Sequence, residues 1–165
     1  MKRLMMIVAM FAVGTLLIVP VLGQDPGGGK ALNLATKLTE QGAATFNTAD
    51  AKAMAAYYTP DAKVFLQGRG EDGLTVKVYD GREEIERLYA DFFKDRGTIQ
   101  SKNTVEYARL LTSDILVIAG TFVPDQNTAQ PLTVPFYQVR VKQGDKWLIN
   151  SLRIFVVAEK KDHRG

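Results

Sequence analysis

The feature that most constrains the fold is a change of hydrophobic periodicity near Gly97. After this residue, apolar and polar side chains alternate, as they do in strands that bury one face. Before it, apolar residues recur mainly at helical spacing. The clearest case is a run at i, i+3, i+4, i+7 and i+8, formed by Ile85, Leu88, Tyr89, Phe92 and Phe93. Helices that come first, with strands that follow, indicate an α+β domain rather than alternating βαβ units.

The same patterns predict individual elements. We expect helices over residues 32–46, about 50–58 and 82–93, the second ended by Thr59-Pro60-Asp61. Asp80 is expected to cap the third helix by accepting from the amide near Glu83. A hairpin is predicted over 63–67 and 74–79, and later strands over 99–110, 115–123, 133–141 and 147–157. The expected architecture is cone-shaped, with three N-terminal helices packed on a strongly bent, mainly antiparallel sheet made of the hairpin and a four-stranded meander.

The N-terminus has the three parts of a secretion signal. Met1-Lys2-Arg3 is positively charged, residues 4–22 form an uninterrupted apolar run, and Gly23 offers a small residue at a cleavage site. About 20 apolar residues are also long enough to cross a bilayer, so an uncleaved anchor stays open. We expect an exported, periplasmic or secreted protein with a signal peptide over 1–23, a linker over 24–30, one domain over 31–157 and a charged, disordered tail over 158–165.

Charge and composition exclude several classes of function. Removing Lys2 and Arg3 with the signal leaves 19 basic residues against 18 acidic ones, a net charge of +1, which gives no case for nucleic-acid binding. The chain has no Cys, and its one histidine, His163, lies in the tail. These facts argue against a catalytic triad and against a zinc site in the domain. We therefore expect no catalytic set, no metal and no cofactor.

One segment matches the dinucleotide-binding pattern G-x-G-x-x-G, at residues 68–73. That pattern binds a pyrophosphate only where the glycines open a helix. Here the next residues, 74–79, alternate in the manner of a strand. The segment is therefore interpreted as a hairpin loop.

Aromatic residues are abundant for a domain of this size. Most are expected in the core, but in a cone-shaped domain some would line an interior pocket together with a few polar groups that orient a ligand. The predicted pocket residues are Tyr57, Phe65, Gln67, Tyr89, Phe93, Tyr107, Tyr137, Asn150 and Arg153.

Four phrases in order along the chain, at residues 46–50, 57–62, 79–85 and 144–149, resemble the nuclear transport factor 2-like (NTF2-like) superfamily. They are FNTAD, YYTPDA, YDGREEI and GDKWLI, and the resemblance covers roughly residues 31–157. The superfamily includes ketosteroid isomerase, scytalone dehydratase and the SnoaL-like polyketide cyclases, and the phrases look most like those of exported SnoaL-like homologues. The resemblance implies the fold and, because dimers are common in the family, a homodimer formed through the outer face of the sheet.

The resemblance does not extend to the catalytic residues of these enzymes. Aligned on Asn47 and Asp50, the general base of the isomerase falls on Leu66 and an oxyanion-hole tyrosine falls on Gly42. The oxyanion-hole aspartic acid falls near Tyr137. Leucine and glycine side chains transfer no proton, so the base and one donor are missing. The histidines of the dehydratase also have no counterpart here.

Three functions remain open from the sequence. The first is an exported domain whose aromatic-lined pocket binds a small apolar or amphipathic molecule. The second is an isomerase, dehydratase or cyclase acting on a small organic substrate, which would require a carboxylate inside the pocket. The third is a structural or assembly module, which would show an apolar patch and no pocket. Membrane attachment is expected only through an uncleaved signal.

Overall fold

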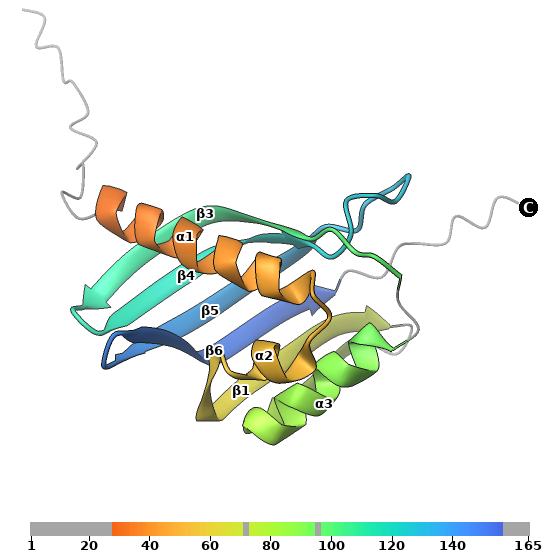
Figure 1. Ribbon diagram of the computed structural model, residues 1–165, viewed down its shortest axis with the longest axis horizontal. Helices are drawn as coiled ribbons and strands as arrows, with labels where there is room; N and C mark the ends of the chain where they lie inside the picture. The colour runs from red at the N-terminus through yellow and green to blue at the C-terminus, as the bar shows by residue number, and fades with distance from the viewer. Residues whose placement is uncertain (1–27, 71–72, 95–96, 157–165) are drawn as a thin grey trace, which may run out of the picture.

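The computed structural model describes residues 28–70, 73–94 and 97–156, which fold as one α+β unit (Figure 1). The predicted signal peptide, most of the predicted linker and the predicted tail lie outside the described residues. In chain order the elements are α1 (Gly28–Phe46), α2 (Ala51–Ala55), β1 (Tyr58–Gly70), β2 (Gly73–Asp80), α3 (Arg82–Phe93), β3 (Lys102–Thr112), β4 (Ile115–Val123), β5 (Val134–Gln143) and β6 (Lys146–Val156).

The strands form a six-stranded mixed sheet in the order β2-β1-β6-β5-β4-β3. The predicted hairpin of β1 and β2 and the predicted antiparallel meander from β3 to β6 are both confirmed. The strands β1 and β6 join these two halves by parallel pairing, which the sequence pattern did not predict. The helices lie on one face of the curved sheet, with α1 across β3 and α2 beside α3 (Figure 1).

Two helix boundaries differ from expectation. Helix α1 begins at Gly28, inside the segment predicted as a linker over 24–30. Helix α2 ends at Ala55, and its start is capped by Asp50 Oδ1, which accepts from the amide of Ala53 at 2.8 Å. Tyr58 was predicted to continue this helix, and that prediction is wrong because Tyr58 already begins β1.

The prediction that residues 59–61 end a helix is also wrong, because they belong to β1. Pro60 is tolerated there because the pairing of β1 with β6 shifts its register between Tyr58 and Lys63, and a strand irregularity needs no amide from a proline. The Arg82 guanidinium donates to the Tyr58 carbonyl oxygen and ties α3 to this irregular segment.

The start of α3 is capped differently from the prediction. Gly81 is its N-cap residue and has a φ of 88°, which a glycine adopts without strain. The Asp80 carboxylate instead pairs with Lys63 Nζ across the hairpin. In the first turn, Glu84 Oε2 accepts from the amide of Asp80, the residue before the N-cap, at 2.8 Å.

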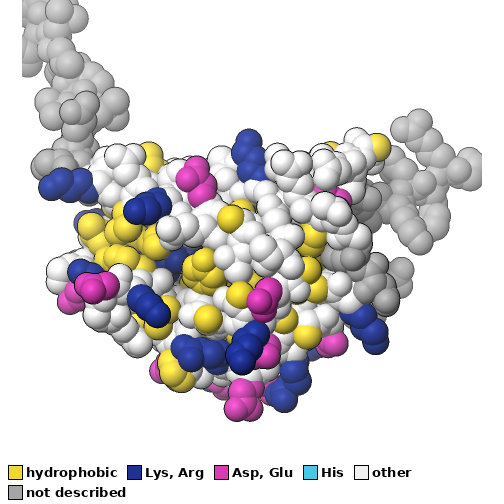
Figure 2. Space-filling model, in the orientation of Figure 1, with side chains coloured by type: hydrophobic (Ala, Val, Ile, Leu, Met, Phe, Trp, Pro, Cys, Tyr) yellow, Lys and Arg dark blue, Asp and Glu magenta, His cyan; other side chains and the backbone are white. Residues whose placement is uncertain are grey.

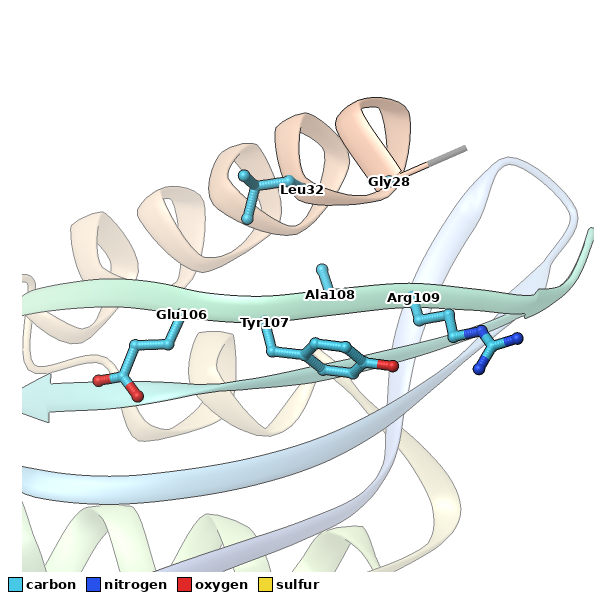
Figure 3. A pocket seen from close by; sticks show the side chains of 6 residues that line it. All are labelled: Gly28, Leu32, Glu106, Tyr107, Ala108 and Arg109. Carbon is cyan, nitrogen blue, oxygen red and sulfur yellow. The ribbon is translucent and has the colours of Figure 1, made fainter. Parts of the chain in front are cut away.

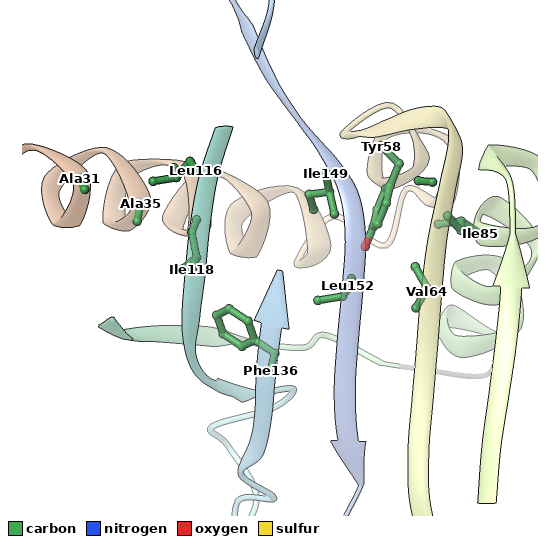
Figure 4. Close-up of a cluster of buried hydrophobic side chains, with 11 residues drawn as sticks. Ala31, Ala35, Tyr58, Val64, Ile85, Leu116, Ile118, Phe136, Ile149 and Leu152 are labelled. Atoms are coloured by element: carbon green, nitrogen blue, oxygen red, sulfur yellow. The ribbon is translucent and has the colours of Figure 1, made fainter. Parts of the chain in front are cut away.

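The two faces of the sheet are assigned by burial and register. We call the face beneath the helices the inner face; its buried residues include Val64, Leu152, Phe136, Ile118 and Tyr58 (Figure 4). Neighbours along a strand point to opposite faces. The opposite face therefore carries a continuous row of cross-strand partners, which we call the outer row: Val78, Phe65, Arg153, Tyr137, Ala119 and Tyr107.

Within the described residues, no helix is both long enough and apolar enough to span a membrane.

Candidate ligand cavity

A cavity of about 350 Å³ lies between the helices and the inner face of the sheet. Its lining is contributed by α1, α2, α3 and strands β1, β3, β4, β5 and β6. Most of the lining side chains are aliphatic or aromatic, as is usual for small-molecule pockets of this size. Tyr58, Val64, Phe136, Ile149 and Leu152 extend from three strands toward this interior (Figure 4).

Phe46 anchors the aromatic wall of the cavity. Its ring packs edge-on against Phe122 at a centroid distance of 5.1 Å and lies 5.2 Å from the ring of Phe92. A third ring, Tyr89, is 6.3 Å away. Edge-to-face packing holds such rings in fixed relative positions, so this wall is formed before any ligand enters.

The largest group of polar lining side chains lies around Arg140 of β5. Its Nε donates to Gln138 Oε1 at 2.9 Å. The hydroxyl groups of Tyr58 and Tyr89 are joined by a hydrogen bond of 2.6 Å. All four residues line the cavity. This polar cluster lies at the Ile149 end of the sheet, because Arg140 pairs with Ile149 in the β5–β6 ladder.

Arg140 is a buried cation. Its side chain is 2% exposed, and its Nη1 has no hydrogen-bond partner among the described residues. Burial lowers its pKa to about 10, although the nearby Tyr58, Tyr57 and Tyr89 act to raise it. The guanidinium therefore remains charged at neutral pH. The two ion pairs between described side chains, Lys63–Asp80 and Arg87–Glu84, do not include it.

The two hydrogen-bonded tyrosines stay neutral in the same surroundings. Burial raises the pKa of Tyr58 well above its usual value, and the neighbouring Tyr89 raises it further. Burial is also the main cause that raises the pKa of Tyr89. Two neutral phenols share one hydrogen bond, so one O–H proton of the pair is left to donate elsewhere.

The other end of the cavity opens near the β4–β5 connection. Pro124 and Leu132 line it there, and Leu132 is 46% exposed. From Arg140 to Val134, the inner face of β5 runs for roughly 20 Å at about 3.4 Å per residue. The cavity is therefore elongated, with Arg140 at its closed end. Toward the mouth its lining is mainly apolar, apart from Asn103, which is in register with Phe122 and Val134.

The structure brings few of the predicted pocket residues to this cavity. Tyr89 lines it. Phe93 packs behind the aromatic wall, 5.0 Å from the ring of Phe46, and the Tyr57 hydroxyl is hydrogen-bonded to Thr45 Oγ1 at 2.9 Å. Asn150 donates to Thr59 Oγ1. The remaining five lie on the outer face of the sheet: Phe65, Gln67, Tyr107, Tyr137 and Arg153. Ligand contact by these nine residues stays a prediction.

The residues that make the closed end polar were not among those predicted from the sequence. Arg140 and Gln138 alternate with Tyr137 along β5, so they share the face of the buried Phe136. That alternation was present in the sequence. Tyr137 was predicted as a pocket residue, whereas the β5 residues on the inner face are Phe136, Gln138 and Arg140.

Two positions where the resemblance would place catalytic groups do line the cavity, Gly42 and Leu66. Neither side chain can transfer a proton. The third position, Tyr137, lies on the outer row. Among the described lining residues there is no aspartate, glutamate or histidine.

A second hollow, of about 540 Å³, lies outside the fold between the start of α1 and β3 (Figure 3). Ala108 faces α1 there, whereas Tyr107 projects from the other side of β3. Leu32 and Tyr107 are 41% and 49% exposed, so this hollow is open to solvent. Hydrophobic side chains are visible on the surface near this end of α1, amid scattered charges of both signs (Figure 2). The described residues contain no group of three or more side chains arranged to hold a metal ion.

Solved structures with the same fold are numerous. One comes from Xanthomonas campestris and is named as a putative calcium/calmodulin-dependent protein kinase II association domain. It is 26% identical in sequence, and the match covers 82% of this chain and 93% of the other, with a TM-score of 0.60. An NTF2-like protein of unknown function from Shewanella oneidensis MR-1 is 18% identical over 75% and 98% of the two chains, with a TM-score of 0.61. A ketosteroid isomerase-like protein from Erwinia carotovora atroseptica is 19% identical over 79% and 96%, with a TM-score of 0.51.

No family model matches the chain, and no curated protein matches it by sequence. The structural neighbours nevertheless include NTF2-like and ketosteroid isomerase-like proteins. The chain therefore has the NTF2-like fold, as the four sequence phrases indicated.

Proposed function

We propose that this protein is an exported binding protein whose interior cavity takes up a small amphipathic molecule. The observation that carries the proposal is the cavity itself, whose lining is mainly apolar and has its charged side chain, Arg140, at the closed end. An apolar molecule with one polar end matches that distribution, because burial of apolar surface supplies affinity and a few polar contacts fix orientation. The cone-shaped fold expected from the family resemblance would enclose such a ligand between its helices and its sheet.

Binding is favoured over catalysis by what lines the cavity. The enzymatic alternative requires a carboxylate or another base that faces the substrate. The described lining has none, and the positions where the isomerase carries two of its catalytic groups are Gly42 and Leu66. A lining without a proton acceptor of suitable pKa supports retention of the bound molecule rather than its conversion.

We also propose a homodimer formed through the outer face of the sheet. Apolar side chains are exposed there: Val78 is 45% exposed, Tyr137 39% and Tyr107 49%. Contiguous exposed apolar side chains are typical of surfaces that contact another protein. The register joins all three through the outer row. The 26%-identical structure is named as an association domain, which supports a second copy as the occupant of this face.

The proposed location is outside the cytoplasm, with cleavage after Gly23. The charged start, the apolar run over 4–22 and the small residue at 23 support it. N-terminal sequencing of the protein recovered from the producing cell tests this, because the chain should then begin at Gln24.

The binding proposal is tested by filling the cavity. Gly42 lies on α1 and lines the cavity, and a Cβ atom added there has no neighbour within 4 Å outside its own turn of helix, so a side chain can start there without a clash. We expect Gly42→Leu to abolish binding of octanoate, octanamide and 1-octanol, measured by calorimetry. It should also stabilise the fold by about 1 kcal/mol, because glycine is a poor helix former.

The matched control is Gly29→Leu, which makes the same substitution at an exposed position of the same helix. It should leave ligand binding unchanged. If the wild-type protein binds none of the three ligands, or if Gly42→Leu binds them as well as the wild type does, the cavity is not a ligand site.

A further inference from the structure

The closed end of the cavity contains a charge with no partner of its own. Arg140 is 2% exposed, and its Nε donates to the neutral side-chain oxygen of Gln138. Its Nη1 is buried without a partner among the described residues. A buried charge is costly unless it is paired and hydrogen-bonded. An aliphatic residue at this position would avoid that cost. The presence of an arginine there therefore indicates that an anionic ligand pairs with it.

From this we propose that the cavity binds a small monocarboxylate head-first, with the carboxylate held by Arg140 and the apolar chain extending along β5 toward Leu132. This inference rests on the proposed binding function and names the class of its ligand. It assigns to Arg140 a contact with the ligand rather than a role in the core.

A carboxylate suits the donors that are available. A guanidinium presents its N–H groups in a planar fork that matches a carboxylate, and such charge-assisted hydrogen bonds are among the strongest in proteins. The Tyr58–Tyr89 pair has one O–H proton left to donate, since its two oxygens share a single hydrogen bond. Arg140 and this phenol pair line the same cavity. The guanidinium can donate to one oxygen of a carboxylate, and the phenol can donate to the other.

The balance of charge favours a monoanion. Arg140 is the only Lys or Arg among the described lining residues. A phosphate monoester carries a charge of about −1.5 to −2 at neutral pH, so its second charge would be buried without a counter-ion. A neutral amide would satisfy Nη1 but would leave the guanidinium charge uncompensated. Carboxylates therefore fit this end better than either alternative.

The dimensions limit the size of the ligand. At roughly 30 Å³ for each water-sized group, a cavity of about 350 Å³ holds on the order of 12 non-hydrogen atoms. Octanoate, with ten, is a suitable probe. Its chain would pass between Phe136 and the aromatic wall around Phe46, both of which line the cavity. The mouth at Leu132 leaves room for somewhat longer chains to reach solvent.

The test compares octanoate with octanamide, which has the same number of non-hydrogen atoms and no charge, and with octyl phosphate. Calorimetry on the wild-type protein should show octanoate binding on the order of tenfold to a hundredfold more tightly than octanamide, and octyl phosphate binding more weakly than octanoate. In Arg140→Met this preference for octanoate should disappear while octanamide binding persists, which also demonstrates that the variant is folded. Arg109→Met, on the exposed part of β3, should behave as the wild type.

Equal binding of octanoate and octanamide by the wild-type protein would overturn this inference and leave the proposed binding function intact. A preference for octyl phosphate would replace the carboxylate with a phosphate as the head group and would also overturn it. Binding of octanoate by Arg140→Met at wild-type affinity would show that another residue holds the head group. Absence of binding by all three probes would instead count against the proposed function itself.

Discussion

The two faces of the sheet each carry an arginine among aromatic rings, yet the two arginines differ in every respect that matters for function. On the outer row, Arg153 stacks on the ring of Phe65 at 4.3 Å and remains partly exposed. On the inner face, Arg140 is almost fully buried, its pKa is lowered to about 10 by burial, and its Nη1 has no partner in the described chain. Bulk water can solvate the guanidinium of Arg153. Only a ligand or a water molecule inside the cavity can accept a hydrogen bond from Arg140 Nη1.

This difference shows that burial, rather than residue type, marks the candidate site. A stacked surface arginine contributes on the order of 1 kcal/mol and is common in structures. A buried arginine without a counter-ion reduces stability unless it has a function. Ligand binding is therefore proposed for the inner face, and contact between copies of the chain remains the proposal for the outer face.

The largest expected effect separates the two faces by fold stability. Ile118→Ala removes a fully buried inner-face side chain and should lower the free energy of unfolding by about 2–5 kcal/mol. Tyr137→Glu, on the outer row opposite Arg153, should change it by no more than about 1 kcal/mol. Urea unfolding of both variants at low protein concentration measures the contrast.

The same pair of variants also tests assembly. In sedimentation experiments Tyr137→Glu should be a monomer, because a carboxylate would be buried at the centre of the proposed interface, while Ile118→Ala should keep the wild-type association state. A dimer that survives Tyr137→Glu would show that the outer row is not the interface.

A smaller effect concerns protons at the closed end of the cavity. The pKa values of Tyr58 and Tyr89 are raised in the folded protein. Above pH 10, a smaller fraction of both hydroxyls should therefore be ionised when folded than when unfolded, where a tyrosine has a pKa of about 10. The two hydroxyls therefore contribute to the stability of the fold below pH 10. This contribution is lost as the pH rises through their pKa values in the folded protein. The pKa of Arg140 is lowered to about 10 in the folded protein, so its contribution to the free energy of unfolding increases as the pH rises above 10.

Absorbance of phenolate at about pH 10.5 measures this effect. Unfolding by urea should increase the signal, and the double variant Tyr58→Phe, Tyr89→Phe should show a smaller increase. An identical increase in the double variant would mean that these two hydroxyls already titrate normally in the folded state.

Much of the fold followed from the sequence because its signals are local. The amphipathic spacing of α3 and the turns between the later strands predicted elements that the structure confirms. The parallel pairing of β1 with β6 joins residues far apart in the chain through an irregular register, and no local pattern encodes it. The strand through Pro60 was missed for the same reason, because only the tertiary context makes that segment extended.

The candidate site was harder to predict because alternation defines two faces without stating which one is buried. In β5, one set of alternate residues includes Phe136, Gln138 and Arg140, and the other includes Tyr137. Ordinary burial preferences place the tyrosine inside and the arginine outside. The structure has the reverse arrangement. A local conflict of this kind with the usual pattern is itself an indication of function.

The central claim is that the cavity holds a carboxylate against Arg140 with the apolar chain pointing outward. A crystal structure of the protein with 8-bromooctanoate tests it most directly, because the anomalous signal of bromine locates the end of the chain. The account predicts the carboxylate within hydrogen-bond distance of Arg140 Nη1 and the bromine on the Val134 side of Phe136, toward the mouth at Leu132. Bromine beside Arg140, or a ligand seated on the outer row near Arg153, would contradict it.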